Sequence, residues 1–549
     1  MTAPVPPLVP APRSYSETGA PFFAAVISAS ADIRFLPALR SFLSDAAAFF
    51  GESVLSPGSA AEEYAHAEKY RDEGSELWGG NFRRESAPVL SFAFRHDPSL
   101  GEGEYRLDFS PSGILAEASD EDGAFAARAT ALQLLLLRWD GWRFELPSCR
   151  IVDAPAFSWR GLMIDSARHF VSIPSLRRIV TLAALYKLDR LHLHLSDDQG
   201  WRMELLNSPR ATEAGSSRSG GDPNRNGFYT QTEVRELVAF AADRGVAVVP
   251  ELDMPGHVEA VLAGDPDLGC SSGPFGVRTA WGVSDDVLCI GNPRSLEFAK
   301  AAWDEVCSLF PAPWVHIGGD ECPTARWEAC PRCAAFKKER GYREWIDLHG
   351  HFVAEIADHL AAKGKTVFGW DEVLDSDQPN RAGVIHWRQW LEDRGSVALA
   401  GGRDLIRSPF FPYYLDFVQA EDRASAPGLA YKTPRAATLR AVHDFDPLQG
   451  LPPDAAAGGP GRGRLLGIQA NAWSEFMRDP RRMEYMLFPR LLAIAETAWL
   501  GSGRPGWDDF RARLDGPRGG QRRLLDLLGV NYCPLEFSAR LEFPGRVAL

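Results

Sequence analysis

The sequence has 549 residues, of which 45% are hydrophobic and 24% are charged, as in ordinary folded globular proteins. This length exceeds what one hydrophobic core usually supports, so we expect a large domain with at least one smaller companion. The formal net charge of -14 argues against nucleic acid or an anionic membrane surface as a partner, because phosphate groups are bound by basic stripes and the sequence has none. A neutral or cationic small ligand fits this composition better.

The N-terminal sequence, MTAPVPPLVPAPRSYS, has neither the basic start nor the apolar run of a signal peptide. No later stretch approaches the roughly 20 apolar residues of a membrane span. We therefore expect a cytoplasmic protein.

The eight cysteines are too sparse for a scaffold built on disulfides. Cys330-Pro-Arg-Cys333 has the spacing of half a zinc site, but no second close pair of Cys or His follows it. We therefore expect loop thiols here and no metal ion, and the nearby Cys322 has no role that the sequence suggests.

The first part of the chain, residues 1–152, is predicted to form a small α+β domain. Strand-like runs at 88–95 and 104–110 accompany a helical stretch at about 124–139. At the other end, residues 506–549 are rich in Arg and Leu and are expected to form a helical extension packed on the preceding domain.

Between these segments, residues 153–505 alternate short apolar runs with longer amphipathic stretches, which is typical of repeated βα units around a parallel sheet. Eight strands with intervening helices predict an α/β fold of the (β/α)8 TIM-barrel type. An open doubly wound sheet is the main rival, although no Gly-rich dinucleotide turn follows the first strand. The expected strands are 159–165, 190–196, 246–252, 313–319, 366–370, 383–387, 403–409 and 464–471.

Carboxylates and aromatic rings follow these strands, at the end of a barrel where active sites are built. Indole and phenol rings stack on the C–H faces of a sugar, while carboxylates, Arg and His bind its hydroxyls and transfer protons. The pattern therefore favours a carbohydrate site over a magnesium site, whose oxygen ligands would be clustered. The residues in question include Arg168, Asp197, His257, Asp320, Glu321, Trp370, Trp387, Tyr414, Asp416, Trp473 and Glu475.

Asp320 and Glu321 are adjacent, and adjacent residues of a regular strand point to opposite sides. They cannot easily flank a scissile bond as two carboxyl groups about 5 to 9 Å apart. At a strand end relaxed by Gly318 and Gly319, both can reach the pocket from one direction, so that one protonates the leaving oxygen while the other acts on a different part of the same sugar.

Five motifs carry a resemblance to a known family. In order and approximate spacing, the sequence resembles the family 20 glycoside hydrolases, the β-N-acetylhexosaminidases, and residues 1–150 resemble, more weakly, the small domain that precedes their barrel. The motifs are RGLMIDSARHF (160–170), HLHLSDDQGWR (192–202), PELDMPGH (250–257), HIGGDE (316–321) and WSE (473–475).

The resemblance implies a retaining, substrate-assisted mechanism, in which the 2-acetamido oxygen of the substrate attacks the anomeric carbon to form an oxazolinium-type intermediate. Glu321 would act as general acid and then as general base. Asp320 would hydrogen-bond the acetamido N–H and stabilise positive charge, and Tyr414 would donate to the acetamido carbonyl oxygen.

The remaining residues take supporting roles by the same resemblance. Arg168 and Glu475 would bind the outer ring hydroxyls, and Asp197 and His257 would form a relay behind Glu321. The sugar pocket would be walled by Trp370, Trp387 and Trp473, with Asp416 beside Tyr414. Tyr413 is the competitor of Tyr414, which is preferred because Tyr-Leu-Asp matches the family's spacing. Structural roles are expected for His192, His194 and His316 within strands, and for Arg160, in an ion pair at the opposite end of the first strand.

The leading hypothesis is thus an exo-acting β-N-acetylhexosaminidase that acts on small carbohydrate substrates and needs no metal or organic cofactor. One alternative is a catalytically silent protein that binds acetamido sugars. Another is an ordinary two-carboxylate retaining glycosidase with Glu321 and Glu475 as the pair. Gluco or galacto preference, chain length and oligomeric state are not specified by the sequence.

Overall fold

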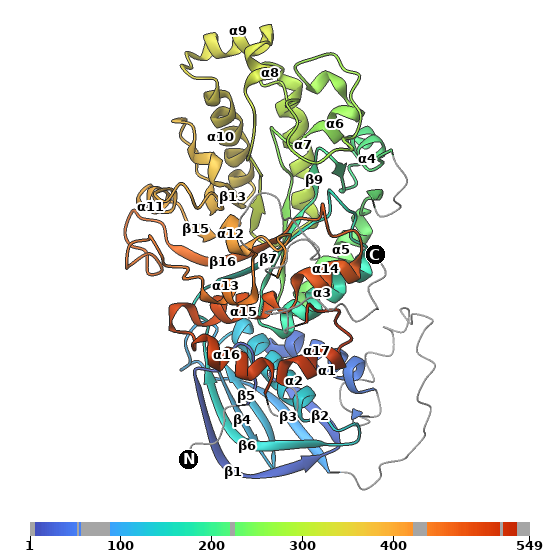
Figure 1. Cartoon of the computed structure of the whole chain (residues 1–549), viewed down its shortest axis with the longest axis vertical. Coiled ribbons are helices and arrows are strands. Elements are labelled where there is room, and N and C mark those ends of the chain that lie inside the picture. Colours follow the sequence, from blue (N-terminus) through green and yellow to red (C-terminus); the bar gives the residue numbers. More distant parts are fainter. Residues whose placement is uncertain are drawn as a thin grey trace.

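The computed structural model describes residues 6–51, 54–55, 88–219, 225–420, 436–516 and 520–534. A twisted sheet at one end of the molecule is joined to a barrel, and long excursions extend from the far rim of that barrel (Figure 1). The predicted combination of a small α+β domain and a TIM barrel is confirmed.

The N-terminal domain is a six-stranded sheet with two helices, α1 (Leu36–Phe50) and α2 (Glu121–Arg138). Phe42, Phe92 and Leu135 are among the apolar side chains that are buried between the sheet and these helices. The strand order is β1-β6-β4-β5-β3-β2. The strands are β1 (Ser14–Ala24), β2 (Val26–Ala31), β3 (Val89–His96), β4 (Tyr105–Ser110), β5 (Gly113–Ala118) and β6 (Phe144–Asp153).

The large domain is a closed barrel of eight parallel strands, which excludes the open doubly wound sheet. Each predicted strand forms, and each is buried along nearly its whole length, as apolar runs in parallel sheets are. The strands are β7 (Trp159–Asp165), β8 (Arg190–His194), β11 (Ala247–Glu251), β12 (Trp314–His316), β13 (Thr366–Trp370), β14 (Gly383–His386), β15 (Leu405–Arg407) and β16 (Leu465–Ala472).

Helices surround the barrel, and their starts follow from the sequence. The side chain of Thr230 accepts a hydrogen bond from Glu233 N–H, and the Glu233 carboxylate accepts one from Thr230 N–H, so the two residues form a capping box. The outer helices are α3 (Ile173–Leu185), α5 (Gln231–Ala242), α7 (Pro293–Leu309), α10 (Ile346–Ala362), α11 (Arg394–Ala400), α13 (Leu439–Asp444) and α15 (Arg490–Leu500).

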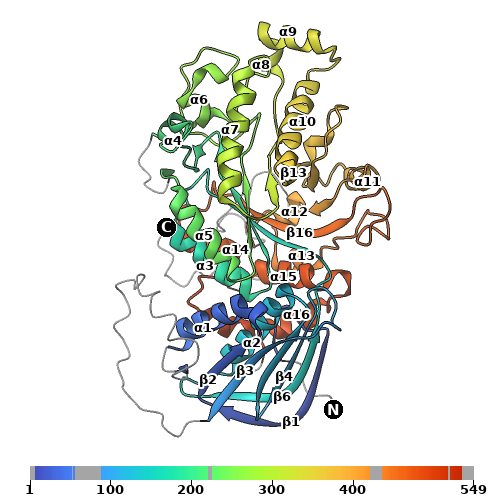
Figure 2. The ribbon, with the colours of Figure 1, turned by 180° about the vertical axis from the view of Figure 1, so that it is seen from behind.

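Short elements follow the carboxyl ends of the strands, and several of them extend away from the N-terminal sheet (Figure 2). They are β9 (Ser196–Asp197), β10 (Gly200–Trp201), α4 (Pro209–Gly215), α6 (Glu259–Gly264), η5 (Pro266–Leu268), α8 (Ala325–Glu328), α9 (Pro331–Arg340), η6 (Asp371–Leu374), α12 (Phe410–Tyr413) and α14 (Pro480–Leu487).

The two domains meet through buried ion pairs and helix contacts. Lys187 Nζ lies 2.8 Å from Asp153 Oδ2, both fully buried. Within the barrel, at the same end, Arg160 at the start of β7 pairs with Asp189 at 2.6 Å, which confirms the structural ion pair expected for it. These contacts occupy the end of the barrel opposite the rim loops.

The C-terminal segment contacts both the barrel helices and the N-terminal domain, and Arg513 of its first helix pairs with Glu496 of the barrel helix α15. It forms two short helices, α16 (Trp507–Leu514) and α17 (Gly520–Leu527), and α17 packs against α2 of the N-terminal domain. Arg523 donates to the carbonyls of Leu137 and Trp139, at the C-terminal end of α2. Carbonyls at a helix end lack partners within the helix, which explains why these Arg-rich helices seat there.

Within the described residues, no helix has both the length and the apolar character to cross a membrane.

Candidate active site

Asp320 and Glu321 leave β12 through a turn that requires glycine. Gly318 has φ 68°, and a Cβ there would overlap the Asp253 carboxylate. Glu321 itself has φ 45°, a left-handed conformation that costs a non-glycine residue about 1–3 kcal/mol and persists at functional sites. Both carboxylates consequently face His257, with Asp320 buried and the Glu321 side chain 45% exposed.

Asp253, after β11, lies against Asp320. Its Oδ1 accepts a 2.9 Å hydrogen bond from the Gly319 N–H. Burial raises the pKa of Asp253 to about 7. The positive charge of His257 acts to lower this pKa, while the negative charge of Glu251 acts to raise it. Burial and the charge of Asp253 raise the pKa of Asp320 well above its usual value. We infer that the two carboxyl groups share a proton near neutral pH.

His257 stands at the centre of a carboxylate cluster. Its Nδ1 lies 3.3 Å from Asp197 Oδ1, and its Nε2 lies 3.7 Å from Asp320 Oδ2 and 3.8 Å from Glu321 Oε2. Burial opposes protonation of this ring, but the charges of Asp197 and Asp320 outweigh it and hold the His257 pKa well above its usual value. The imidazole is therefore a cation beneath the two adjacent acids.

Arg168 is anchored at the end of β7 next to the same cluster. Its Nη2 lies 2.6 Å from Asp197 Oδ2, and its guanidinium lies 5.0 Å from the centre of the Trp473 ring. Burial would raise the pKa of Asp197, but Arg168 and His257 hold it well below its usual value. Asp197 thus links the arginine to the histidine as a permanent anion.

The strand histidines surround one buried carboxylate that the sequence analysis did not single out. Glu251, the last residue of β11, lies 2.6 Å from His194 Nδ1 and 2.9 Å from His316 Nδ1, and within 3.0 Å of His192. His194 also lies 3.0 Å from Asp197. The structural role expected for these histidines fits this position beneath the site.

Aromatic rings form one wall. Tyr414 stacks on Trp387 with centroids 6.1 Å apart and lies 5.8 Å from Trp473. Trp370 packs behind Trp473 at 5.8 Å and donates from Nε1 to Glu251. The structure brings together all four rings that the sequence analysis selected.

Tyr413, the competitor of Tyr414, lies elsewhere. Its ring is fully buried against Phe445, with centroids 4.8 Å apart. Burial, together with the charges of Asp320 and Glu372, raises the pKa of Tyr414 well above its usual value. Tyr414 is therefore a neutral hydrogen-bond donor at the site.

Asp416 and Glu475 present acceptors that the protein leaves unpaired. Asp416 Oδ1 and Glu475 Oε2 are buried and make no hydrogen bond among the described residues. Burial and the charge of Glu475 raise the pKa of Asp416 to about 8, and burial raises the pKa of Glu475 against the influence of Arg168. Unpaired buried acceptors are costly, so these atoms fit hydroxyl groups of a ligand.

A pocket of about 360 Å³ opens beside Glu321. Trp387 and Trp390 line it, and Trp390 is 56% exposed. Glu372, also in its lining, accepts a 3.0 Å hydrogen bond from Trp387 Nε1. Glu372 was not among the predicted site residues, although its place directly after the fifth barrel strand marked it.

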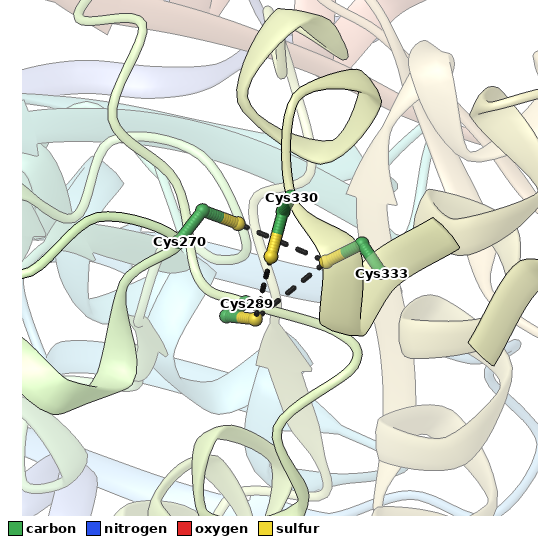
Figure 3. A group of neighbouring side chains, drawn as sticks. All are labelled: Cys270, Cys289, Cys330 and Cys333. Carbon is green, nitrogen blue, oxygen red and sulfur yellow. Dashed lines mark hydrogen bonds between the residues drawn. The ribbon is translucent and has the colours of Figure 1, made fainter. Parts of the chain in front are cut away.

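The thiols depart from expectation. Cys270 and Cys289, far from Cys330 and Cys333 in sequence, bring their sulfur atoms to the same point (Figure 3). The sequence analysis expected loop thiols at Cys330 and Cys333 without a second pair, and the structure supplies that pair, because sequence spacing does not reveal which loops meet. Cys322 is not part of this cluster, and its Cβ packs where Gly256 leaves room for it.

The barrel and the acids and indoles at its rim define a protein of the carbohydrate-active class. Comparisons with known proteins make this specific. The model described as glycosyl hydrolase family 20, catalytic domain, matches residues 157–502, and the family's domain 2 matches residues 5–154. The chain therefore belongs to glycosyl hydrolase family 20.

Individual relatives agree. A beta-hexosaminidase from Porphyromonas gingivalis is 36% identical over 441 residues, with 79% of this chain and 55% of the relative covered. Another from Vibrio furnissii is 36% identical, with 73% and 66% covered, so the chain spans only about half to two thirds of these two proteins. The crystal structure of a Vibrio harveyi exo-β-N-acetylglucosaminidase with N-acetylglucosamine has a TM-score of 0.81 at 31% identity, covering 97% of this chain and 79% of that one.

Proposed function

We propose that this protein is an exo-β-N-acetylhexosaminidase, which releases terminal non-reducing N-acetylglucosamine or N-acetylgalactosamine from oligosaccharides or glycoconjugates. The observation that carries the proposal is the placement of Asp320 and Glu321 on one turn, facing the same histidine. Such a pair does not flank a glycosidic bond, so the nucleophile is supplied by the substrate's acetamido group.

Glu321 is the general acid in this mechanism. Its side chain is half-exposed at the mouth of the pocket, where a leaving group departs toward solvent. It protonates the glycosidic oxygen as the acetamido oxygen attacks the anomeric carbon, and then removes a proton from the water that opens the oxazolinium ring.

Asp320 and Tyr414 orient that nucleophile. Asp320 accepts a hydrogen bond from the acetamido N–H, and the positive charge that develops on the amide favours its ionised form, with the shared proton held by Asp253. Tyr414, neutral and adjacent, donates to the acetamido oxygen. Groups fixed in this way act mainly on the transition state.

The outer part of the sugar is bound by the arginine and the unpaired acids. Arg168 is fixed by its ion pair with Asp197. Asp416 Oδ1 and Glu475 Oε2 have no hydrogen-bond partner among the described residues. Polar groups placed to bind the outer hydroxyls of a terminal sugar support exo rather than endo cleavage. His257, with Asp197 behind it, places a positive charge beside both adjacent acids, and this charge favours the ionised form of Asp320.

The deciding experiment compares an aryl N-acetyl-β-glucosaminide with the matching aryl β-glucoside. We expect turnover of the first with retention of configuration, and none of the second, because it lacks the acetamido nucleophile. Equal turnover of both, or a trapped covalent glycosyl-enzyme, would establish the two-carboxylate route instead.

Binding of N-acetylglucosamine without release of the phenol would identify a silent sugar-binding protein. Glu321→Gln serves as the companion variant. It should lose most activity on glycosides with poor leaving groups and much less on those with good ones, because a good leaving group needs little protonation.

A further inference from the structure

Four cysteine sulfur atoms meet on the rim, outside the sugar site. Cys330 precedes α9 and Cys333 lies in its first turn, while Cys270 and Cys289 come from the long connection between β11 and α7 (Figure 3). All four Sγ atoms lie within 4.8 Å of one another. Three separate stretches of chain therefore meet here. Two of them supply one thiol each, and the segment with Cys330 and Cys333 supplies two.

The spacing of the sulfur atoms matches a tetrahedral metal site. Cys289 Sγ lies 3.6 Å from Cys333 Sγ and 3.7 Å from Cys330 Sγ, and Cys270 Sγ lies 3.7 Å from Cys333 Sγ. A zinc–sulfur bond is about 2.3 Å long, so the edges of a ZnS4 tetrahedron are about 3.8 Å. Disulfide bonding requires a separation of about 2.05 Å, and all four cysteines are free.

We propose that Cys270, Cys289, Cys330 and Cys333 form a structural zinc site that fastens the β11–α7 connection to the segment following Glu321. Zinc is the divalent ion that four soft thiolates in tetrahedral geometry select, and a site with four protein ligands leaves no position for substrate. Binding releases the protons of the four thiols and leaves a zinc tetrathiolate of net charge -2.

The backbone around the thiols is built for such a charge. Gly291 N–H donates to Cys333 Sγ at 3.4 Å, the kind of contact that supports a thiolate. A Cβ at Gly291 would overlap the carbonyl of Arg332, so the close approach requires glycine. Arg332, inside the CxxC motif, donates to the carbonyl of Gly269 next to Cys270 and brings a positive charge to the cluster.

The proposed ion also has a protected setting. Val287, Trp327 and Leu348 are fully buried around the three most buried cysteines. Trp327 Nε1 donates to the carbonyl of Leu288, adjacent to Cys289. These contacts form an apolar cluster separate from the main core, too small to order two long rim segments without further support.

The position of the site gives the ion a positioning role for catalysis. Leu288 N–H donates to the carbonyl of Pro255 at 2.9 Å, two residues before His257. Cys330 closes the segment that begins at Glu321. A metal at the cluster therefore holds the backbone on both sides of the contact between His257 and Glu321, without touching substrate.

The test begins with metal content. Protein purified without added metal is expected to contain about one zinc per chain by elemental analysis. Cys330→Ser and Cys333→Ser should lose the zinc. Cys307→Ser, the same change at a cysteine on α7 outside the cluster, should retain it. Iron in place of zinc, or full zinc retention in both CxxC variants, would overturn the proposal.

Thiol labelling separates a metal site from disulfides. In the folded protein, the four cluster thiols should resist alkylation and become reactive when a zinc chelator is added, with no reductant needed. Protection that is removed only by a reductant, with no metal present, would mean two disulfides and overturn the zinc site. Where a serine variant fails to fold, chelation of the unmodified chain provides the same readout.

Zinc removal should also lower the melting temperature, and readdition should restore it. Because the ion acts through the loops, we expect kcat for an aryl N-acetylglucosaminide to fall. The released sugar should still have the anomeric configuration of the substrate. An unchanged melting temperature after the zinc has been removed by a chelator would contradict a structural role. Since this readout does not depend on the substrate, it stands even if the proposed sugar specificity fails.

Discussion

His257 Nε2 lies 3.7 Å from Asp320 Oδ2, so a buried cation faces a carboxyl group whose pKa is raised by burial and by Asp253. The cation acts against that shift, since it favours the ionised form of Asp320. The balance between these two effects decides how much of the site is in its active ionic state at a given pH.

His257→Asn removes the cation and should therefore raise the pKa of Asp320 further. A higher carboxyl pKa means that less of the anion is present at any pH below it, so the acid limb of kcat/KM should move to higher pH by about one unit. The measurement is a pH profile of kcat/KM beside that of His359→Asn, a change at a surface histidine. Superimposable profiles for His257→Asn and the parent would disprove this electrostatic role.

Asp320→Asn tests the alignment of the acetamido group. The change removes the charged acceptor, so kcat should fall about 10²–10³-fold with little change in KM, because the contact strengthens in the transition state. Steady-state kinetics on an aryl N-acetylglucosaminide provide the values, with Asp267→Asn, at a largely exposed position, as the control. An unchanged kcat would remove Asp320 from the mechanism.

Tyr413 and Tyr414 offer a matched pair of adjacent tyrosines with different surroundings. Tyr414→Phe should lower kcat on the order of 10²-fold with a small change in melting temperature, because it deletes one donor to the acetamido oxygen. Tyr413→Phe should leave kcat nearly unchanged, since its ring packs against Phe445 away from the site. The opposite pattern would show that the wrong tyrosine has been assigned.

Glu475→Gln tests the unpaired acceptors at the far end of the pocket. Loss of a charged hydrogen-bond acceptor should lower kcat/KM by about 10- to 100-fold, equivalent to roughly 1.5–3 kcal/mol. Parallel kinetics on the N-acetylgluco and N-acetylgalacto epimers show whether the loss differs between them. An effect confined to stability, with kinetics intact, would place Glu475 outside the sugar site.

Much of the barrel and its rim could be predicted because both depend on short-range pattern. The run at 159–165 forms β7 with the same bounds. Rim residues such as Asp197 and Asp320 could be selected because the carboxyl ends of parallel barrel strands converge on one side. Their separate chemical roles came from the family resemblance.

Contacts between distant segments could not be predicted in the same way. Glu251 read as an ordinary strand residue, yet three histidines from neighbouring strands surround it. The path of the C-terminal segment to α2 likewise depends on which surface is free after the barrel closes. Such facts follow from register and packing, which no local pattern encodes.

The adjacent acids and the cysteines mark this boundary. The sequence determined that a Gly-Gly turn delivers Asp320 and Glu321 to the rim, because the strand before them and the glycines are local features. Only the tertiary structure decided that Cys270 and Cys289 reach Cys330 and Cys333. Cys289 and Cys330 are 41 positions apart, and the folding of two different loops brings them together. Long loops have many ways to close, and packing selects one of them.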